Sequence, residues 1–215
     1  MNAFLLSEIT SLRLYILFTF IVFIFNFKKI NYRNYLLLIL TLSILNEIAL
    51  IYFKSQKLSI GLNTTIYCFL NYILWFLILF KVNKINFKTK IIVLTLFSIF
   101  SICNLFFIET QLKFNLNTFI VGAIIYVSLF IFQIINELRK ENLQFFLSNE
   151  FILVFVPIIF FLGFSLLFSF KYSELPYVKI FNDITLFKFI SHFVNIIYYS
   201  LINIYILKER KISNG

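Results

Sequence analysis

The 215-residue chain has little of what catalysis or metal binding usually requires, with one histidine, two cysteines and four glycines. A catalytic zinc ion usually takes three protein ligands, so one histidine excludes the histidine-rich zinc sites of membrane-embedded lipid hydrolases. Two cysteines form neither a disulfide framework nor a metal-binding pattern. The chain has no glycine-rich loop, which excludes the phosphate-binding fingerprints. We therefore expect no cofactor and no metal.

Charged residues are also scarce, at 13% of the chain, whereas 61% of the residues are hydrophobic and 21% are aromatic. Soluble domains have about 45–50% apolar and about 25% charged residues. A globule of this size cannot bury such an excess, so the solvent of most of the chain must be the lipid bilayer. The net charge of +10 does not indicate nucleic acid, because lysine and arginine lie between apolar runs rather than on one face. They are typical of loops beside anionic headgroups.

Seven apolar runs are long enough to cross a bilayer, which takes about 20 helical residues. The intervening segments are too short for a folded soluble domain, so residues 1–215 are expected to form a single integral membrane domain. The predicted fold is all-α, a seven-transmembrane-helix bundle. Helix caps are expected at Asn34, Asn63, Asn149 and Asp183, each of which precedes an apolar run. The expected spans are 9–27, 34–53, 63–81, 90–108, 115–137, 150–170 and 184–207.

The distribution of lysine and arginine predicts how the chain is threaded. The loops after the first, third and fifth spans, together with the C-terminal tail, hold twelve of these residues, and the opposite side holds seven. Cytoplasmic loops carry the excess of positive charge. We therefore expect the N-terminus outside and the C-terminus in the cytoplasm. The first run is not a cleavable signal peptide, because its basic residues follow the apolar core rather than precede it.

Glu47 is the most unusual residue of the predicted spans, because it places a carboxylate inside an apolar helix. A central charge costs about 2.5–3.5 kcal/mol on the insertion scale, and each leucine, isoleucine or phenylalanine offsets about 0.3–0.6 kcal/mol of this cost. The second span therefore inserts, but Glu47 needs a partner or a proton. Ionisable groups inside membranes usually face the bundle interior and mark a site or a pathway.

Other polar residues are expected at the depth of Glu47, in the outer half of the membrane. On the last span, His192, Asn195, Tyr199 and Asn203 recur at helical spacing, which indicates one polar face. Polar faces at one depth on several helices predict a wet cavity that opens outward. For any single asparagine, a hydrogen bond that joins two helices, worth about 0.6 kcal/mol, is the competing interpretation. The predicted ligand-binding residues are Asn46, Glu47, Asn71, Asn104, His192 and Asn195.

Enzymatic and retinal-binding functions are not supported. A retinal protein needs a lysine in the middle of its last helix, and Lys188 lies near one end of this span. Ser165 and His192 superficially match the serine–histidine pair of an intramembrane protease, but the remaining residues of that pattern are missing. A transporter often has two matching halves with Gly- or Pro-broken helices. Here only Pro157 is expected to kink a span, with Gly163 easing its packing.

Five stretches carry a resemblance: Asn46-Glu47, "YCFLNYILWFLILFKV", "ICNLFFIE", "NTFIVGAIIYVSLFIFQIINEL" and "NIIYYSLINIYIL". Together they cover most of residues 34–207 and resemble a family of small seven-span bacterial membrane proteins with no established activity. Members of that family often lie beside sensor histidine kinases, so the resemblance implies a sensory or signal-relay role in the bacterial inner membrane. It names no functional residue.

The leading hypothesis is a non-enzymatic sensor or receptor-like subunit that binds a small or lipidic ligand in the outer-half cavity. Its basic segments "KVNKINFKTK" and "KERKISNG" would contact anionic lipid or a cytoplasmic signalling partner such as a histidine kinase. The alternative is a small transporter or channel in which Glu47 exchanges protons. A polar path that reaches the cytoplasmic side through Asn203 and Gln133 would favour transport.

Overall fold

The computed structural model describes residues 10–109, 111, 113–169, 178–181 and 184–214. Within them, seven helices are long and apolar enough to cross a membrane. This confirms the predicted number of spans, and the observed bounds lie within a few residues of the expected ones except at the C-terminal end of the last helix, which continues to Asn214. The seven helices are α2 (Ser11–Asn26), α3 (Arg33–Ser55), α4 (Gly61–Val82), α5 (Phe87–Cys103), α6 (Leu116–Arg139), α8 (Asn149–Ser169) and α9 (Leu186–Asn214).

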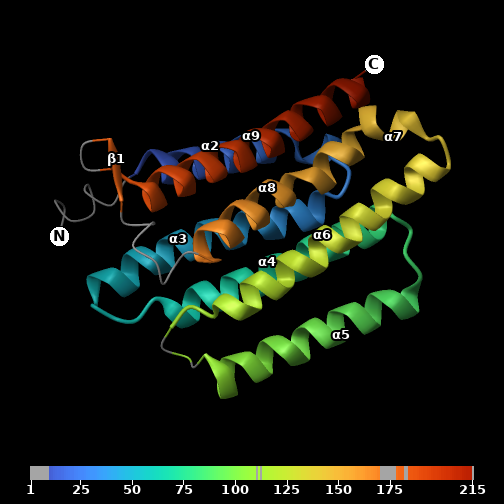
Figure 1. The fold of residues 1–215 in the computed structure, drawn as a ribbon. Helices are drawn as coiled ribbons and strands as arrows, with labels where there is room; N and C mark the ends of the chain where they lie inside the picture. Colours follow the sequence, from blue (N-terminus) through green and yellow to red (C-terminus); the bar gives the residue numbers. More distant parts are fainter. Residues whose placement is uncertain (1–9, 110, 112, 170–177, 182–183, 215) are drawn as a thin grey trace.

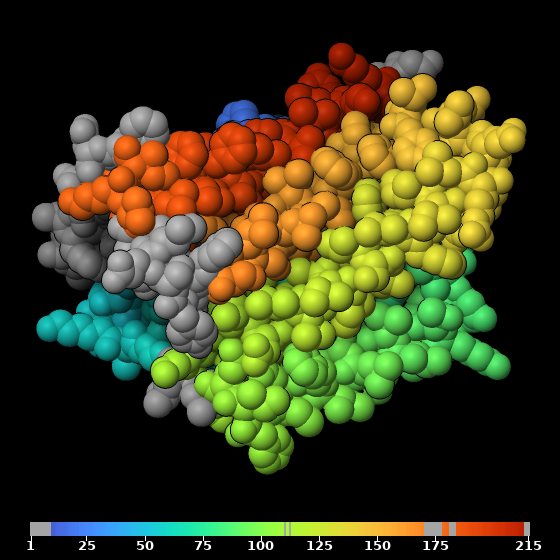
Figure 2. Space-filling view, viewed as in Figure 1, coloured from blue at the N-terminus to red at the C-terminus, as the bar shows by residue number. Residues whose placement is uncertain are grey.

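The seven helices run side by side, and the start of α2 and the end of α9 lie at opposite ends of the bundle (Figure 1). The end that holds Thr10 and the loop 56–60 is called the N-terminal end. The end that holds the loop 27–32 and the last turns of α9 is called the C-terminal end. Figure 2 shows α6, α8 and α9 together on one face of the molecule, with α5 at its edge. The fold is thus an all-helical membrane bundle.

Aromatic side chains of α4, α6, α8 and α9 form the centre of the bundle. Tyr72 is fully buried, stacks on Phe161 with 4.0 Å between ring centroids, and donates a 2.7 Å hydrogen bond to the carbonyl oxygen of Phe119. Trp75 is also fully buried and donates to the Tyr198 hydroxyl at 3.1 Å. Lipid tails are as apolar as leucine, so close packing and hydrogen bonds, rather than the hydrophobic effect, hold such helices together.

Short elements interrupt the segments that the sequence predicts as plain helix or loop. The fourth span ends in a π-helix, Asn104–Ile108, and the first span ends in a 3₁₀ turn, Phe27–Lys29. The predicted loop before α8 contains the short helix α7 (Leu143–Leu147). The loop before α9 contains a small antiparallel pair, β1 (Lys179–Phe181) and β2 (Ile184–Thr185).

The predicted helix caps are wrong where the structure describes them. Asn34 and Asn63 lie inside α3 and α4, and Asn149 is the first residue of α8; Asp183 lies outside the described residues. Other side chains accept from a backbone N–H in the first turn of a helix. Thr10 accepts from Arg13 and Asn86 from Lys88, and Ser148 accepts from Phe151 and Thr185 from Lys188. Two of the expected caps instead join helices to one another, because Asn63 donates to Asn46 of α3 and Asn149 donates to Glu209 of α9.

Candidate functional site

Glu47 has an ion-pair partner on the neighbouring helix. The Nε atom of Arg13 lies 2.8 Å from Oε2 of Glu47, and the two side chains are 12% and 24% exposed. Arg13 lies in the first turn of α2, and Glu47 lies about two turns before the end of α3. Because α2 and α3 are consecutive antiparallel helices, both positions fall near the N-terminal end of the bundle. Arg13 is therefore the partner that a carboxylate inside an apolar helix requires.

The ion pair lies at the edge of an apolar groove between α2 and α3. The groove has a volume of 290 Å³ and is lined by aliphatic side chains, of which Ile16 is buried: Leu14, Ile16, Leu17, Ile44, Ile48 and Ile51. Leu14 and Ile48 are more than half exposed and so face the lipid. Ligand pockets commonly measure about 300–1,000 Å³, so this groove suits a segment of acyl chain rather than a large polar molecule.

A group of hydroxyls, here called the hydroxyl seam, lies behind the ion pair and consists of Ser43, Tyr67 and Tyr199. Ser43 Oγ donates to the carbonyl oxygen of Ile39 at 3.0 Å, so it must accept from the Tyr67 hydroxyl, 3.2 Å away. Tyr199 lies beside both side chains and within electrostatic reach of Glu47. The seam therefore joins α3 to α4 and α9 beside the ion pair.

Asn46 and Asn71 bond to other partners than Glu47. The side-chain oxygen of Asn46 accepts a 3.0 Å hydrogen bond from Asn63 of α4. Asn71 is 1% exposed, lies beside the Tyr198 hydroxyl, and has a buried carbonyl oxygen without a partner among the described residues. Both asparagines thus link α4 to a neighbouring helix, which is the competing interpretation that the sequence left open for single asparagines.

Asn104 belongs to a separate cluster between α5 and α6. Its amide nitrogen donates to Glu109 at 2.7 Å and to Thr118 at 2.9 Å, and the backbone N–H of Asn117 donates to the same Glu109 oxygen at 2.9 Å. The π-helix that begins at Asn104 brings Glu109 back to this position. A widened turn of this kind is often found at functional sites, but here its polar groups mainly tie the end of α5 to the start of α6.

His192 lies on the other flank of α2 from Glu47. It borders a second groove, of 280 Å³, together with Ser11, Leu12, Tyr15 and Ile196. The residues of α2 that face this groove lie on the opposite side of that helix from those that face the ion-pair groove. His192 Nδ1 lies 2.9 Å from the backbone oxygen of Lys188. Asn195 donates to the backbone oxygen of Ser191 at 2.8 Å.

The structure therefore distributes the six predicted site residues over several places. Glu47 borders the ion-pair groove, His192 borders the groove on the other side of α2, and Asn104 lies at the junction of α5 and α6. Arg13 was counted only among the seven cations on the side opposite the predicted cytoplasm, although it forms the ion pair. The pairing could have been found by noting that both residues lie near the same end of two consecutive antiparallel spans.

Comparison with known proteins finds no match: no protein-family model fits the chain, and no curated protein and no solved structure is similar to it at a significant level. The resemblance to seven-span bacterial membrane proteins thus stays a prediction. The geometry of the chain itself carries the functional argument.

Proposed function

We propose that this protein is a receptor-like subunit of the bacterial inner membrane that binds a lipidic ligand in the ion-pair groove between α2 and α3. The observation that carries the proposal is a partly exposed ion pair, Arg13–Glu47, at the edge of an apolar groove of 290 Å³. An amphiphile matches both features. Its polar head exchanges hydrogen bonds with the ion pair, and its acyl chain lies along Leu14 and Ile48.

Stability alone does not account for the ion pair. Replacing a buried ion pair by well-packed apolar residues is often neutral or stabilising, and charges inside membranes are rare and mark functional sites by default. The pair holds α2 to α3 at a single point of an otherwise aliphatic groove. A bound head group that competes for Arg13 or Glu47 would change the contact between these two helices.

The other end of the same two helices offers a route for the signal. The loop between α2 and α3 is bonded to α9, because the backbone N–H of Asn31 donates to Glu209 at 3.1 Å and the Tyr205 hydroxyl donates to the Asn31 carbonyl oxygen at 2.8 Å. A shift of α2 against α3 would therefore reach the end of α9. In the proposed orientation, with the N-terminus outside, this end lies in the cytoplasm, where its basic segments contact a signalling partner such as a histidine kinase.

Transport by protonation of Glu47 is the weaker alternative. Asn203 donates to Thr19 at 3.0 Å, but its side-chain oxygen has no partner among the described residues. Gln133 of α6 is buried, and its side-chain oxygen likewise has no partner in the described part of the chain. Between these two side chains no hydrogen-bonded path links the described residues. This arrangement favours binding over conduction.

Native mass spectrometry of the protein released from lipid nanodiscs tests the proposal. We expect wild type to retain one co-purified amphiphile, and Glu47→Gln to retain it about tenfold less, because a charge-assisted hydrogen bond is worth about 1.5–3 kcal/mol. Ile48→Trp, which fills the groove without touching the charges, should reduce retention as well.

Glu141→Gln is the matched control, because it makes the same chemical change at an exposed position at the C-terminal end. It should retain the amphiphile as wild type does. Equal retention by wild type, Glu47→Gln and Ile48→Trp, or no bound amphiphile in any of them, contradicts the proposed function.

A further inference from the structure

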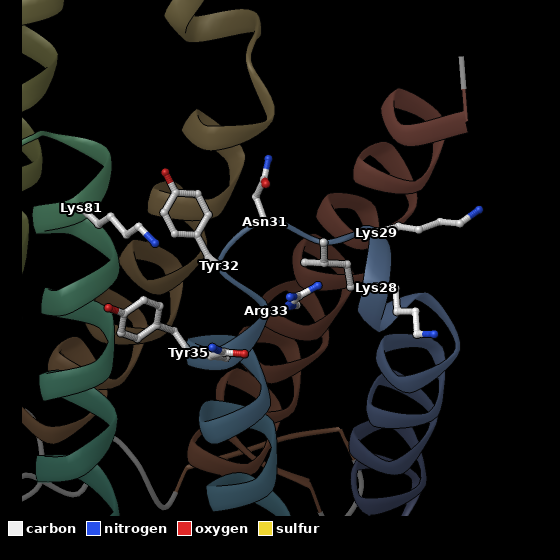
Figure 3. Close-up of a pocket in the computed structure, with 9 residues that line it drawn as sticks. Lys28, Lys29, Asn31, Tyr32, Arg33, Tyr35 and Lys81 are labelled. Carbon is white, nitrogen blue, oxygen red and sulfur yellow. The ribbon is translucent and has the colours of Figure 1, made fainter.

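A second cleft lies at the C-terminal end of the bundle, away from the ion-pair groove. It has a volume of 510 Å³ and is formed by the loop between α2 and α3, the first turn of α3 and the last turn of α4 (Figure 3). Four of the nine residues that line it are cations, and none is a carboxylate. The lining residues are Lys28, Lys29, Ile30, Asn31, Tyr32, Arg33, Asn34, Tyr35 and Lys81.

Aromatic rings rather than carboxylates position two of these cations. The guanidinium of Arg33 lies 5.5 Å from the ring centroid of Phe27. The ammonium of Lys81 lies 5.2 Å from the ring of Tyr32 and 5.7 Å from that of Tyr35, and Figure 3 shows these two rings beside it. Ion pairs among the described residues involve Arg13 and Lys140, not Arg33 or Lys81. Cation–π contacts hold a charge in place without neutralising it.

The nearby carboxylates are held outside the cleft by other bonds. Glu150 accepts a 2.8 Å hydrogen bond from the Tyr32 hydroxyl. Burial, together with this bond, raises the pKa of Tyr32 well above its ordinary value, so the hydroxyl remains a donor at every physiological pH. Glu209 accepts from the backbone N–H of Asn31 and from Asn149. Both carboxylates therefore support the walls of the cleft, and among the described residues neither forms an ion pair with Arg33 or Lys81.

We propose that this cleft binds a phosphate group, supplied by the headgroup of an anionic phospholipid. Arginine binds phosphate through paired N–H donors and lysine binds it as a point charge. The cleft lies where α2 and α4 end and α3 begins, which is the depth of lipid headgroups for spanning helices. The site is independent of the ion-pair groove and of its ligand, because it lies at the other end of the bundle.

Native mass spectrometry in detergent with added phosphatidylglycerol or phosphatidylethanolamine tests this site. Wild type is expected to retain one phosphatidylglycerol in preference to phosphatidylethanolamine. The double variant Arg33→Gln/Lys81→Gln should retain it about tenfold less, because it removes two cations that line the cleft and would form charge-assisted hydrogen bonds to the phosphate. The control Lys88→Gln/Lys90→Gln removes the same charge at the same end but outside the cleft, and should stay within about twofold of wild type.

Two further measurements complete the test. One uses a variant that keeps all the cations of the cleft, and the other distinguishes a lipid headgroup from free phosphate. Asn34→Asp adds a carboxylate to an exposed position in the cleft without removing a cation, and should also lower retention. If inorganic phosphate raises the melting temperature of wild type but not of the double variant, while phosphatidylglycerol is not retained, the phosphate site stands and its source is soluble. Equal lipid retention and equal response to phosphate in wild type, both cleft variants and the control overturn the proposal.

Discussion

Alanine in place of Glu209 is expected to lower the free energy of unfolding by about 3 kcal/mol. Glu209 is only 6% exposed, and its two oxygens accept hydrogen bonds from the backbone N–H of Asn31 at 3.1 Å and from the amide of Asn149 at 2.7 Å. A hydrogen bond to a charged group contributes about 1.5–3 kcal/mol. Removing the carboxylate leaves two donors without this acceptor and weakens the attachment of α9 to both the α2–α3 loop and the start of α8, which then depends on Tyr205.

The unfolding of this variant can be followed by the fluorescence of Trp75, which is the only tryptophan of the chain and is fully buried. A titration with sodium dodecyl sulfate in mixed micelles should show unfolding of Glu209→Ala at a lower detergent fraction than wild type. Glu209→Gln retains one acceptor oxygen and should fall between them. Glu141→Ala removes an exposed carboxylate at the same end and should match wild type. Unfolding of Glu209→Ala together with wild type would contradict the prediction.

The role of Glu209 also shows where sequence patterns stop being informative. The stretch "KERK" is typical of a solvated basic tail, and the last span was expected to end at residue 207. In the structure α9 continues to Asn214, and Glu209 is turned inward. A single carboxylate among three cations looks like surface charge in the sequence. Only its spatial neighbours, Asn31 and Asn149, distant in sequence, reveal that it joins three parts of the chain.

The seven spans could be predicted because bilayer insertion depends on local hydrophobicity, which the sequence contains directly. Depth along each span was equally accessible, since each residue advances a helix by about 1.5 Å. The rotation of each helix about its axis was not. Neighbouring residues point about 100° apart, so Asn46 contacts α4 whereas Glu47 contacts Arg13 of α2. Polar residues at the same depth therefore need not line the same cavity, because they point in different directions.

The polar face predicted on the last span is only partly buried against other helices. Tyr199 and Asn203 are buried against α2 and α3 partners, as the helical spacing indicated, whereas His192 and Asn195 bond to the backbone of their own helix. Periodicity identifies the face that points inward, but not which of its polar groups finds a partner on another helix. Near the N-terminal end of α9, the groove beside α2 leaves that face open.

Alanine in place of Gly163 is expected to destabilise the bundle by about 2 kcal/mol, although alanine favours helix over glycine by about 1 kcal/mol. An added Cβ would lie 2.5 Å from Cγ2 and 3.2 Å from Cγ1 of Val194. Val194 is only 5% exposed, and valine in a helix has essentially one side-chain rotamer, so the side chain cannot turn away. This contact agrees with the expectation that Gly163 eases the packing of its span.

If Gly163→Ala lowers the free energy of unfolding, close packing outweighs helix propensity at this position. A second substitution, at Val194, tests this directly. Val194→Ala alone should destabilise by about 1 kcal/mol or more through lost contacts. In the double variant Gly163→Ala/Val194→Ala the new Cβ occupies the space vacated by the valine branches. Its free energy of unfolding, measured by the same detergent titration, should exceed that of Gly163→Ala. If the destabilisations of Gly163→Ala and Val194→Ala simply add in the double variant, the contact between these two residues does not set the distance between α8 and α9. The close approach of the two helices must then depend on other residues.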